Sequence, residues 1–292
     1  MKEVEFTWKR EKPEDFIVRE VSEFEMESSG NFFLYLLAKR NLTTREVCKK
    51  FNLSYAGMKD RFALTFQKVS AEKFLGDYYE EHLDETSWFK LKFLGRVKKK
   101  VKIGQLKGNK FAINVKNLKI KEISAFINYY DIQRTSKNWE RGKEILEKLI
   151  EKPKKRLSWS QNFLIDSYLS YLWNKSLEEF LKEKFSGYYV RESGEKFFIP
   201  DELKVEKLPK FWTILGYKKK LLNSEIYYRR VLEREGWKLE EILELLKKLG
   251  IKGDYRMTYV IPRETKRIGN YLFFFLPKGA FATMLLKHAI VE

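Results

Sequence analysis

The sequence predicts an α+β protein, because segments with strand character at both ends of the chain flank a middle with helical character. At the ends, apolar and polar residues alternate, and β-branched and aromatic residues are frequent. From about residue 121, apolar residues recur at intervals of three and four, as on one face of a helix. We therefore expect a domain formed by residues 1–136 and 253–292, and a helix-rich insert formed by residues 137–252.

The first part of the chain is predicted to form strands interrupted by one short helix. Thr43 or Thr44 caps this helix, Glu46 lies in its first turn, and it ends near Asn52. The predicted strands lie at residues 14–21, 31–39, 65–70, 88–94 and 110–115.

The rest of the chain is mainly helical until strands return near its end. Gly250 and Gly253 end the last helix of the insert. Small strands and turns are expected within 186–216, and longer strands at 254–262 and 270–276. The predicted helices span residues 121–130, 138–151, 158–184, 223–235, 238–249 and 281–290.

The charge balance points to a polyanionic partner. The 292 residues carry a net charge of +18 and the pI is near 9.6, which suits nucleic acid or an anionic membrane surface. A membrane span is not expected, since no run of about 18 apolar residues occurs. No apolar segment follows Met1, so we expect no secretory signal and a cytoplasmic protein.

Cysteine and histidine are too few for a metal cluster. Cys48 is the single cysteine, which excludes an internal disulfide. His82 and His288 are the two histidines, and each is expected to be a surface residue or a structural residue with its hydrogen bonds satisfied. We expect neither a metal nor a cofactor.

Two features of the sequence suit RNA. Of the 23 Phe, 16 Tyr and 7 Trp, we expect most to be core or sheet residues and a handful, interleaved with basic residues, to stack on exposed bases. The basic run Arg96–Lys102 lies between two predicted strands. It is either a solvated hairpin tip or an edge that contacts phosphates, and the sequence leaves both interpretations open.

The most informative segment contains Lys59-Asp60-Arg61, just after Gly57 and just before a predicted strand. Adjacent positive charge favours the ionised form of an aspartate, which can then act as a nucleophile or a base. The triplet alone, however, is more often a solvated surface turn.

The longer string changes this interpretation. Residues 57–67, Gly-Met-Lys-Asp-Arg-Phe-Ala-Leu-Thr-Phe-Gln, resemble the Gly-x-Lys-Asp-(Lys/Arg)-x-Ala-x-Thr-x-Gln signature of the TruD family of pseudouridine synthases. The resemblance makes Asp60 the catalytic nucleophile and places Lys59 at the substrate site. It also implies the pseudouridine synthase fold, a mixed and largely antiparallel sheet with flanking helices in a circularly permuted order. The inserted TruD domain would form the second wall of an RNA cleft.

The segment Lys12-Pro13-Glu14-Asp15-Phe16 resembles the family's N-terminal Pro-Glu-Asp-Phe motif. The resemblance assigns Phe16 to the substrate site, whereas on its pattern alone this residue is a strand core residue. The cation three residues before the proline is usually Lys in the family. Here it is Arg10, with Lys9 beside it.

Two further motifs place residues at the site by resemblance. Gly108-Asn109-Lys110-Phe111 resembles the Gly-Asn-x-Phe motif, which assigns Asn109 to active-site contacts and Phe111 to the face beneath the target base. A flipped-out uracil needs such a flat apolar surface. Residues 277–284 resemble the C-terminal Pro-x-Gly-(Ser/Ala)-(Phe/Tyr)-Ala-Thr motif, in which Phe281 lines the substrate site.

The segment 128–136 resembles the family's Asn-Tyr-Phe-x-x-Gln-Arg-Phe-Gly sequence. Gln133 and Arg134 are its candidate polar contacts to substrate. The final Phe-Gly of the family is replaced here by Thr135-Ser136, a departure at the junction with the insert.

Together the motifs imply a monomeric tRNA pseudouridine synthase that converts uridine 13 of tRNA and needs no metal or cofactor. Two alternatives are a synthase for another RNA position and a non-catalytic RNA-binding protein that keeps the fold. A nuclease is disfavoured, because no clustered acidic metal site is evident. Whether Asp60 attacks the sugar or the base, or removes a sugar proton, stays open.

Overall fold

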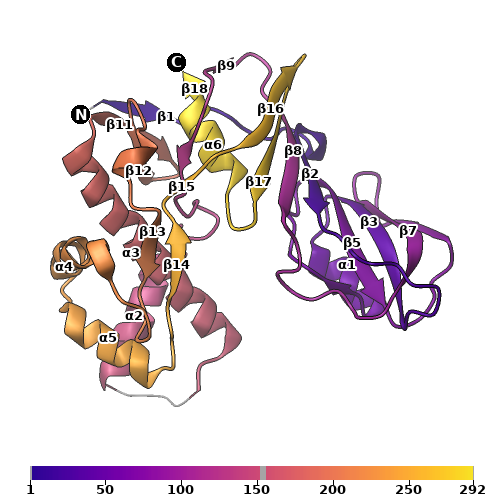
Figure 1. Cartoon of the computed structure of the whole chain (residues 1–292), viewed down its shortest axis with the longest axis horizontal. Helices are drawn as coiled ribbons and strands as arrows, with labels where there is room; N and C mark the ends of the chain where they lie inside the picture. The colour runs from indigo at the N-terminus through magenta and orange to yellow at the C-terminus, as the bar shows by residue number, and fades with distance from the viewer. Residues whose placement is uncertain (1, 152–155, 292) are drawn as a thin grey trace. The chain divides into compact units, whose positions relative to one another are not determined.

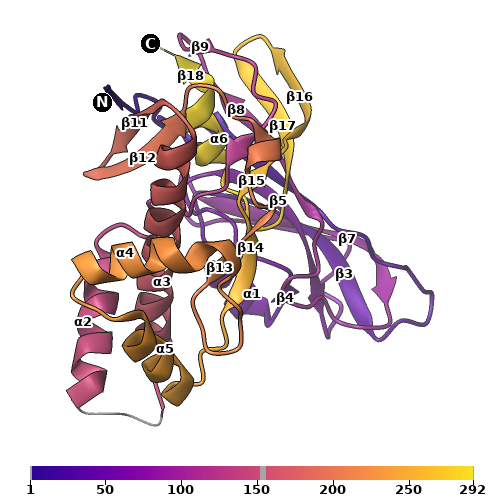
Figure 2. The same cartoon turned by 60° about the vertical axis from the view of Figure 1, so that its left-hand side comes forward.

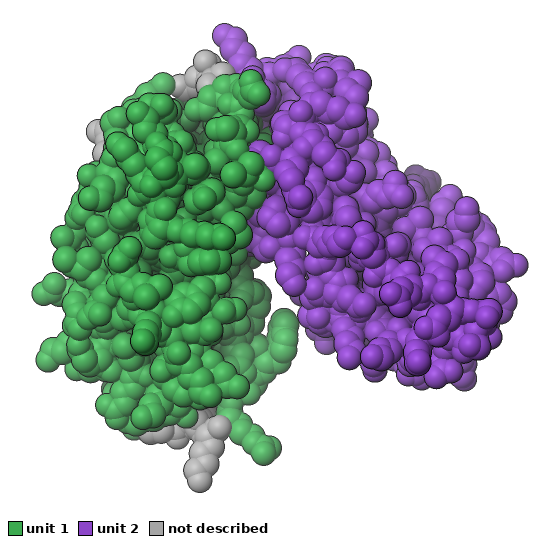
Figure 3. Space-filling view, in the orientation of Figure 1, with its two compact units in different colours: residues 1–7, 121–261, 283–290 green, residues 8–120, 262–282, 291–292 purple. Residues whose placement is uncertain are grey.

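The computed structural model describes residues 2–151 and 156–291. Residues 1, 152–155 and 292, which belong to the predicted domain ranges, lie outside the described part. The chain divides into two compact units, drawn in green and purple in Figure 3. Unit 1 comprises residues 1–7, 121–261 and 283–290, and unit 2 comprises residues 8–120, 262–282 and 291–292. The predicted domain boundaries at 136/137 and 252/253 stay a prediction.

Unit 2 is built on one mixed sheet (Figure 1), in which the described residues form nine strands. Only β2 and β5 are described as a parallel pair in it. In spatial order the strands are β16 (Arg263–Ile268), β17 (Tyr271–Pro277), β8 (Gly108–Asn114), β2 (Phe16–Val21), β5 (Leu64–Ala71), β3 (Phe32–Arg40), β7 (Trp88–Val97) and β6 (Tyr78–His82), with β4 (Ser54–Tyr55) paired to β5.

One helix covers part of this sheet. Thr43 caps α1 (Thr44–Phe51) through the reciprocal hydrogen bonds with Glu46 that the sequence indicates. Val47 and Cys48 of α1 pack into the core formed by β3, β5 and β7. The short elements η1 (Pro13–Asp15) and β9 (Lys119–Ile120) complete unit 2.

Unit 1 is helix-rich and carries small sheets. Figure 2 shows α4 crossing the long α3, and α2 packs along α3. A Cβ added at Gly142 would lie 2.1 Å from the Leu164 carbonyl oxygen, so only glycine allows α2 to approach α3 this closely. The helices are α2 (Asn138–Glu151), α3 (Trp159–Lys184), α4 (Glu225–Arg234), α5 (Leu239–Lys248) and α6 (Ala282–Ala289), with the short turns η2 (Val205–Lys207) and η3 (Leu222–Ser224).

The strands of unit 1 form separate small sheets. A three-stranded sheet contains β1 (Glu3–Glu5), β11 (Gly187–Glu192) and β12 (Glu195–Pro200). Two pairs consist of β10 (Phe126–Ile127) with β15 (Tyr259–Val260) and of β13 (Phe211–Ile214) with β14 (Asp254–Met257). The last strand among the described residues is β18 (Ile290–Val291), of which Ile290 belongs to unit 1.

The predicted α+β class is confirmed, and one predicted element is wrong. Residues 121–130 form no helix; they contain β10, in which Phe126 pairs with Val260. The apolar spacing there serves this long-range pairing and not a helix face. Strand β16 was not predicted, because all six of its residues are exposed and give no alternation.

Within the described residues, no helix is long and apolar enough to cross a membrane.

Candidate active site

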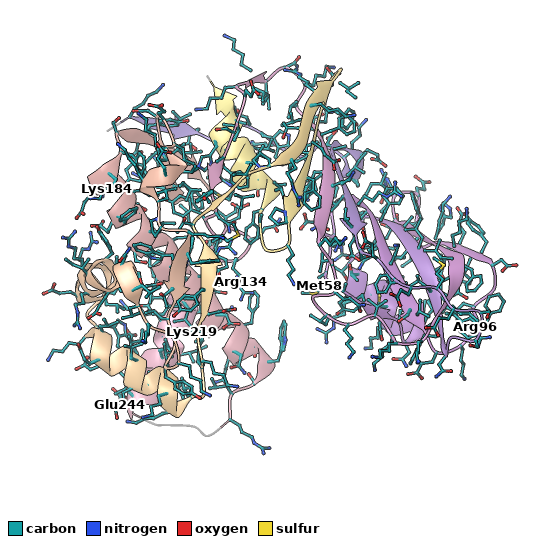
Figure 4. All side chains as sticks on the ribbon, viewed as in Figure 1. Met58, Arg96, Arg134, Lys184, Lys219 and Glu244 are labelled. Carbon is teal, nitrogen blue, oxygen red and sulfur yellow. The ribbon has the colours of Figure 1, made fainter. Side chains whose placement is uncertain are left out.

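Asp60 lies in the loop that leads into β5. This strand is central in the sheet, parallel to β2 on one side and antiparallel to β3 on the other. The loop therefore starts from a fixed backbone. Met58, labelled in Figure 4, lies on the same loop and is 69% exposed, so the loop faces solvent.

The carboxylate of Asp60 pairs with Arg10. The Nη2 atom of Arg10 donates to Oδ2 of Asp60 at 3.3 Å, and Nη1 donates to the Phe62 carbonyl oxygen at 3.0 Å. The Asp60 side chain keeps 29% of its surface exposed, against 13% for Arg10. A charged carboxylate is thus accessible from one side and balanced by a guanidinium on the other.

Lys39 holds the backbone of the same loop, a contact that the sequence analysis missed. It is fully buried on β3, and its Nζ donates to the carbonyl oxygens of Asp60 at 2.8 Å and Leu42 at 2.6 Å. Burial lowers the pKa of Lys39 to about 8. A signal was present, because Lys39 follows Tyr35 and Leu37 in the alternation that faces the core.

Buried hydrogen bonds fix the rest of the loop. The Lys59 N–H donates to Oγ1 of Thr44 at 3.0 Å, and this hydroxyl donates to Gln67 Oε1 at 2.8 Å. The amide of Gln67 in turn donates to the Gly57 carbonyl oxygen at 3.0 Å. The glutamine that ends the signature therefore secures the glycine that begins it.

The two cations beside Asp60 in sequence have other partners. Lys59 Nζ donates to Glu20 Oε2 at 2.6 Å, and both side chains are almost fully buried. Arg61 pairs with the exposed Glu46 at 3.4 Å. A contact of Lys59 with substrate stays a prediction.

An aromatic cluster adjoins the ion pair. The Arg10 guanidinium carbon lies 3.7 Å from the centroid of the Phe16 ring. Phe16 contacts the edge of Phe111 at 5.7 Å between centroids, and Phe111 stacks on Phe274 at 5.3 Å. The contacts thus run from Asp60 through Arg10 and Phe16 to Phe111. Both phenylalanines are buried, with 3% of Phe16 and 8% of Phe111 exposed.

The segment that carries Arg10 is anchored by Asp15. Its Oδ2 accepts from the N–H groups of Glu11 at 2.9 Å and Lys12 at 3.0 Å, and its Oδ1 accepts from Asn114 Nδ2 at 2.9 Å. Burial alone would raise the pKa of Asp15, but these hydrogen bonds lower it. Asp15 of the N-terminal motif therefore positions Arg10.

Asn109 offers an unused acceptor. Its side-chain oxygen is buried and has no hydrogen-bond partner among the described residues. The preceding Gly108 is required by close packing, since an added Cβ would lie 2.1 Å from the Leu276 carbonyl oxygen. Phe281, just before α6, is half-buried.

Gln133 and Arg134 belong to unit 1, whereas Asp60 belongs to unit 2. Gln133 is exposed, and Arg134 pairs with Asp166 at 3.4 Å and lies 5.3 Å from the Phe163 ring centroid. Their contacts to substrate stay predictions.

The backbone in and just after the basic run bonds to β5 and to the start of the Asp60 loop. The Gly104 N–H donates to the Ala56 carbonyl oxygen at 2.7 Å, and the Val101 N–H donates to Ser70 Oγ at 2.9 Å. Arg96 lies within β7 and donates to the Gly30 carbonyl oxygen. The exposed lysines of the run are Lys98, Lys99, Lys100 and Lys102.

Both histidines have the expected structural roles. His82 is exposed and lies 2.8 Å from Glu80. His288 is buried; it accepts from the Ile127 N–H at 3.1 Å, and burial lowers its pKa to about 3. No group of three or more His, Cys, Asp and Glu side chains that could hold a metal occurs in the described part of the chain.

Comparisons with known proteins show the family of this chain. The family model for tRNA pseudouridine synthase D (TruD) matches residues 8–153. A probable tRNA pseudouridine synthase D 1 from Methanococcus maripaludis is 28% identical over 95% of this chain and 98% of its own. A tRNA pseudouridine synthase D from Nitratiruptor sp. is 27% identical over 95% and 93%.

A solved structure shares the fold. The crystal structure of a putative tRNA pseudouridine synthase D from Methanosarcina mazei superposes with a TM-score of 0.59 at 19% identity, covering 95% of this chain and 92% of that one. The family model spans half of the chain, including Asp60 and the motifs around Phe16 and Phe111. The chain therefore belongs to the tRNA pseudouridine synthase D family.

Proposed function

We propose that this protein isomerises uridine to pseudouridine at position 13 of tRNA, with Asp60 as the nucleophile. The observation that carries the proposal is the accessible carboxylate of Asp60, held between Arg10 at its oxygen and Lys39 at its backbone. Its support is family membership and the signature on this loop.

The reaction conserves atoms and electrons. The bond from the sugar to N1 of uracil breaks, the uracil turns, and a carbon–carbon bond forms from the sugar to C5, whose proton leaves while N1 gains one. Attack by an Asp60 oxygen stabilises the separated state as a covalent adduct, which splits one difficult step into two.

The surrounding cations suit this chemistry. Arg10 contacts a single carboxylate oxygen, Oδ2, and leaves Oδ1 to reach substrate. Since Arg10 also binds the Phe62 carbonyl oxygen and Lys39 binds the Asp60 carbonyl oxygen, the backbone that carries the carboxylate is fixed before substrate arrives. A nucleophile held in this way loses little conformational freedom in the transition state.

The Phe111 ring and the exposed lysines supply binding. A uridine taken out of the RNA stack no longer packs on its neighbours, and an aromatic surface compensates for this. Lys98 to Lys102 precede Gly104, whose N–H donates to the Ala56 carbonyl oxygen at the start of the Asp60 loop, and they offer positive charge to the phosphates of the RNA.

Asp60→Asn should abolish pseudouridine formation, by about 10³-fold or more, because the amide is isosteric but is neither a nucleophile nor a base. Binding of tRNA should stay within about three-fold, since phosphate contacts dominate affinity. Asp77→Asn, an exposed aspartate of the same unit, is the matched control and should keep full turnover. Full turnover by Asp60→Asn would show that Asp60 is not the nucleophile.

Lys39 should make turnover depend on pH. Burial lowers its pKa from 10.5 to about 8, an effect that the Asp60 charge partly opposes. Above about pH 8 the ammonium that holds the Asp60 backbone loses its charge, so kcat should fall. Stability should move in the opposite direction: between about pH 8 and 10.5 the unfolded chain binds more protons than the folded chain, so the contribution of Lys39 to the free energy of unfolding rises with pH.

Lys39→Met should remove the fall of kcat above about pH 8. It should also lower kcat at pH 7 by about ten-fold, which corresponds to an increase of about 1.4 kcal/mol in the activation free energy. Lys68→Met is the control, because Lys68 also donates to a carbonyl oxygen in this sheet, that of Ser22 at 2.6 Å. If kcat of Lys39→Met still falls above about pH 8, the fall is due to the titration of another group.

Phe111→Ala should reduce turnover strongly, because it removes a stacking surface worth about 1–3 kcal/mol. It also removes a buried ring, so a stability loss of about 3–5 kcal/mol is expected. Phe274→Ala controls for the second effect, since Phe274 is buried against Phe111. At equal folded fraction, turnover should fall more in Phe111→Ala, and Phe111→Tyr should retain much activity. Equal losses in the two alanine variants would make Phe111 a core residue only.

Affinity for tRNA should fall steeply with salt, and the basic run should contribute to the slope. Reversing Lys99 and Lys100 to Glu should reduce the slope of log K against log salt by about 0.9 for each phosphate that is no longer bound. The control reverses Lys73 and Lys92, which are also exposed lysines of unit 2. The same slope in both double variants would support the solvated hairpin tip.

A further inference from the structure

Unit 1 contains a pocket that the proposed reaction does not use. Its volume is about 840 Å³, within the range of small-ligand sites. It is lined by residues from α2, α3 and the hairpin of β11 and β12, all of which belong to unit 1.

One wall of the pocket is a flat aromatic surface. The rings of Trp139 and Tyr171 stack at 4.0 Å between centroids, with an angle of 5° between their planes. Both residues line the pocket and are half-buried, so part of the stacked pair faces the cavity. Such a surface suits the face or edge of a planar ring.

The pocket also holds a carboxylate with an unused oxygen. Glu195 Oε2 accepts from Thr135 Oγ1 at 2.7 Å, whereas Oε1 is buried and has no hydrogen-bond partner among the described residues. Burial raises the pKa of Glu195, as expected for a carboxylate short of donors. The neighbouring Glu178 differs, because Lys175 and Tyr189 donate to its two oxygens.

Thr135 stands where the family segment has phenylalanine, and phenylalanine has no hydroxyl to fix Glu195. The orientation of this carboxylate thus depends on a residue at which this chain departs from the family pattern. Lys137 and Arg141 are exposed at the same pocket and can reach phosphates.

We propose that this pocket binds an unstacked base of the substrate RNA that carries an exocyclic amine, namely adenine, cytosine or guanine. The amine donates to Glu195 Oε1, the ring lies against Trp139 and Tyr171, and Lys137 and Arg141 contact the adjoining phosphate. Uracil fits less well, because its N3–H lies between two carbonyl oxygens that the carboxylate repels. The proposal rests on the proposed function for its RNA ligand.

The first test measures binding of AMP, CMP, GMP and UMP to the whole protein by calorimetry. At least one amine-bearing nucleotide should bind ten-fold or more tightly than UMP. Glu195→Leu, whose side chain has no hydrogen-bond acceptor, should remove this preference, and Trp139→Ala should weaken binding at least ten-fold. Trp159→Ala is the matched control, because Trp159 begins α3, is 71% exposed and does not line the pocket. Equal binding of all four nucleotides, or no binding, overturns the proposal.

The second test separates an RNA base from a free nucleotide. The KM for tRNA should rise at least five-fold in Glu195→Leu and stay unchanged in Trp159→Ala, with thermal melts showing that both fold. Nucleotide binding without a change in KM would overturn the RNA assignment. Nucleotide binding is measured without turnover. A negative binding result therefore contradicts the pocket proposal, whereas a wild-type protein that forms no pseudouridine contradicts the proposed function.

Discussion

The ion pair between Arg10 and Asp60 joins the two segments on which the candidate site depends. Arg10 reaches the carboxylate because Asp15 fixes its segment, and its guanidinium lies over the Phe16 ring. Phe16 in turn contacts Phe111. The guanidinium of Arg10 therefore contacts both the proposed nucleophile, Asp60, and the Phe16 ring that packs on Phe111. A shift of this guanidinium would change the orientation of the Asp60 carboxylate and the packing of the two rings.

Much of the fold follows from local sequence, and the exceptions have a common cause. The capping box of α1 and the periodicity of α2 and α3 identify these helices, since each signal lies within a few residues of the element. The helix predicted for residues 121–130 is wrong, because Phe126 and Ile127 form a strand by pairing with Val260 and Tyr259, which are more than a hundred residues away in the sequence. Exposed β16 is likewise an edge strand that its pairing with β17 defines.

The sequence proposes Asp60 for the site, but it does not indicate the contacts that Asp60 makes in the structure. The signature identifies Asp60, yet its sequence neighbours Lys59 and Arg61 are not its partners in the structure. Adjacent residues of an extended loop point in different directions, so proximity in sequence is a poor guide to pairing. Arg10 and Lys39 come from segments that are distant in the sequence. The only sequence signal for Lys39 is its place among the alternate residues of β3 that face the core.

The buried charges around the loop explain what the other signature residues do. Burying Lys59 with Glu20 and Lys39 beneath Asp60 costs desolvation energy, and a hydrophobic core would avoid this cost. Charged and polar groups, however, accept few arrangements, because each needs its own partner. Thr44 and Gln67 bind only one geometry of the loop, and Lys39 fixes the Asp60 carbonyl oxygen within it. Most of the signature thus specifies a single loop conformation, and this conformation keeps its one carboxylate, that of Asp60, partly exposed to solvent.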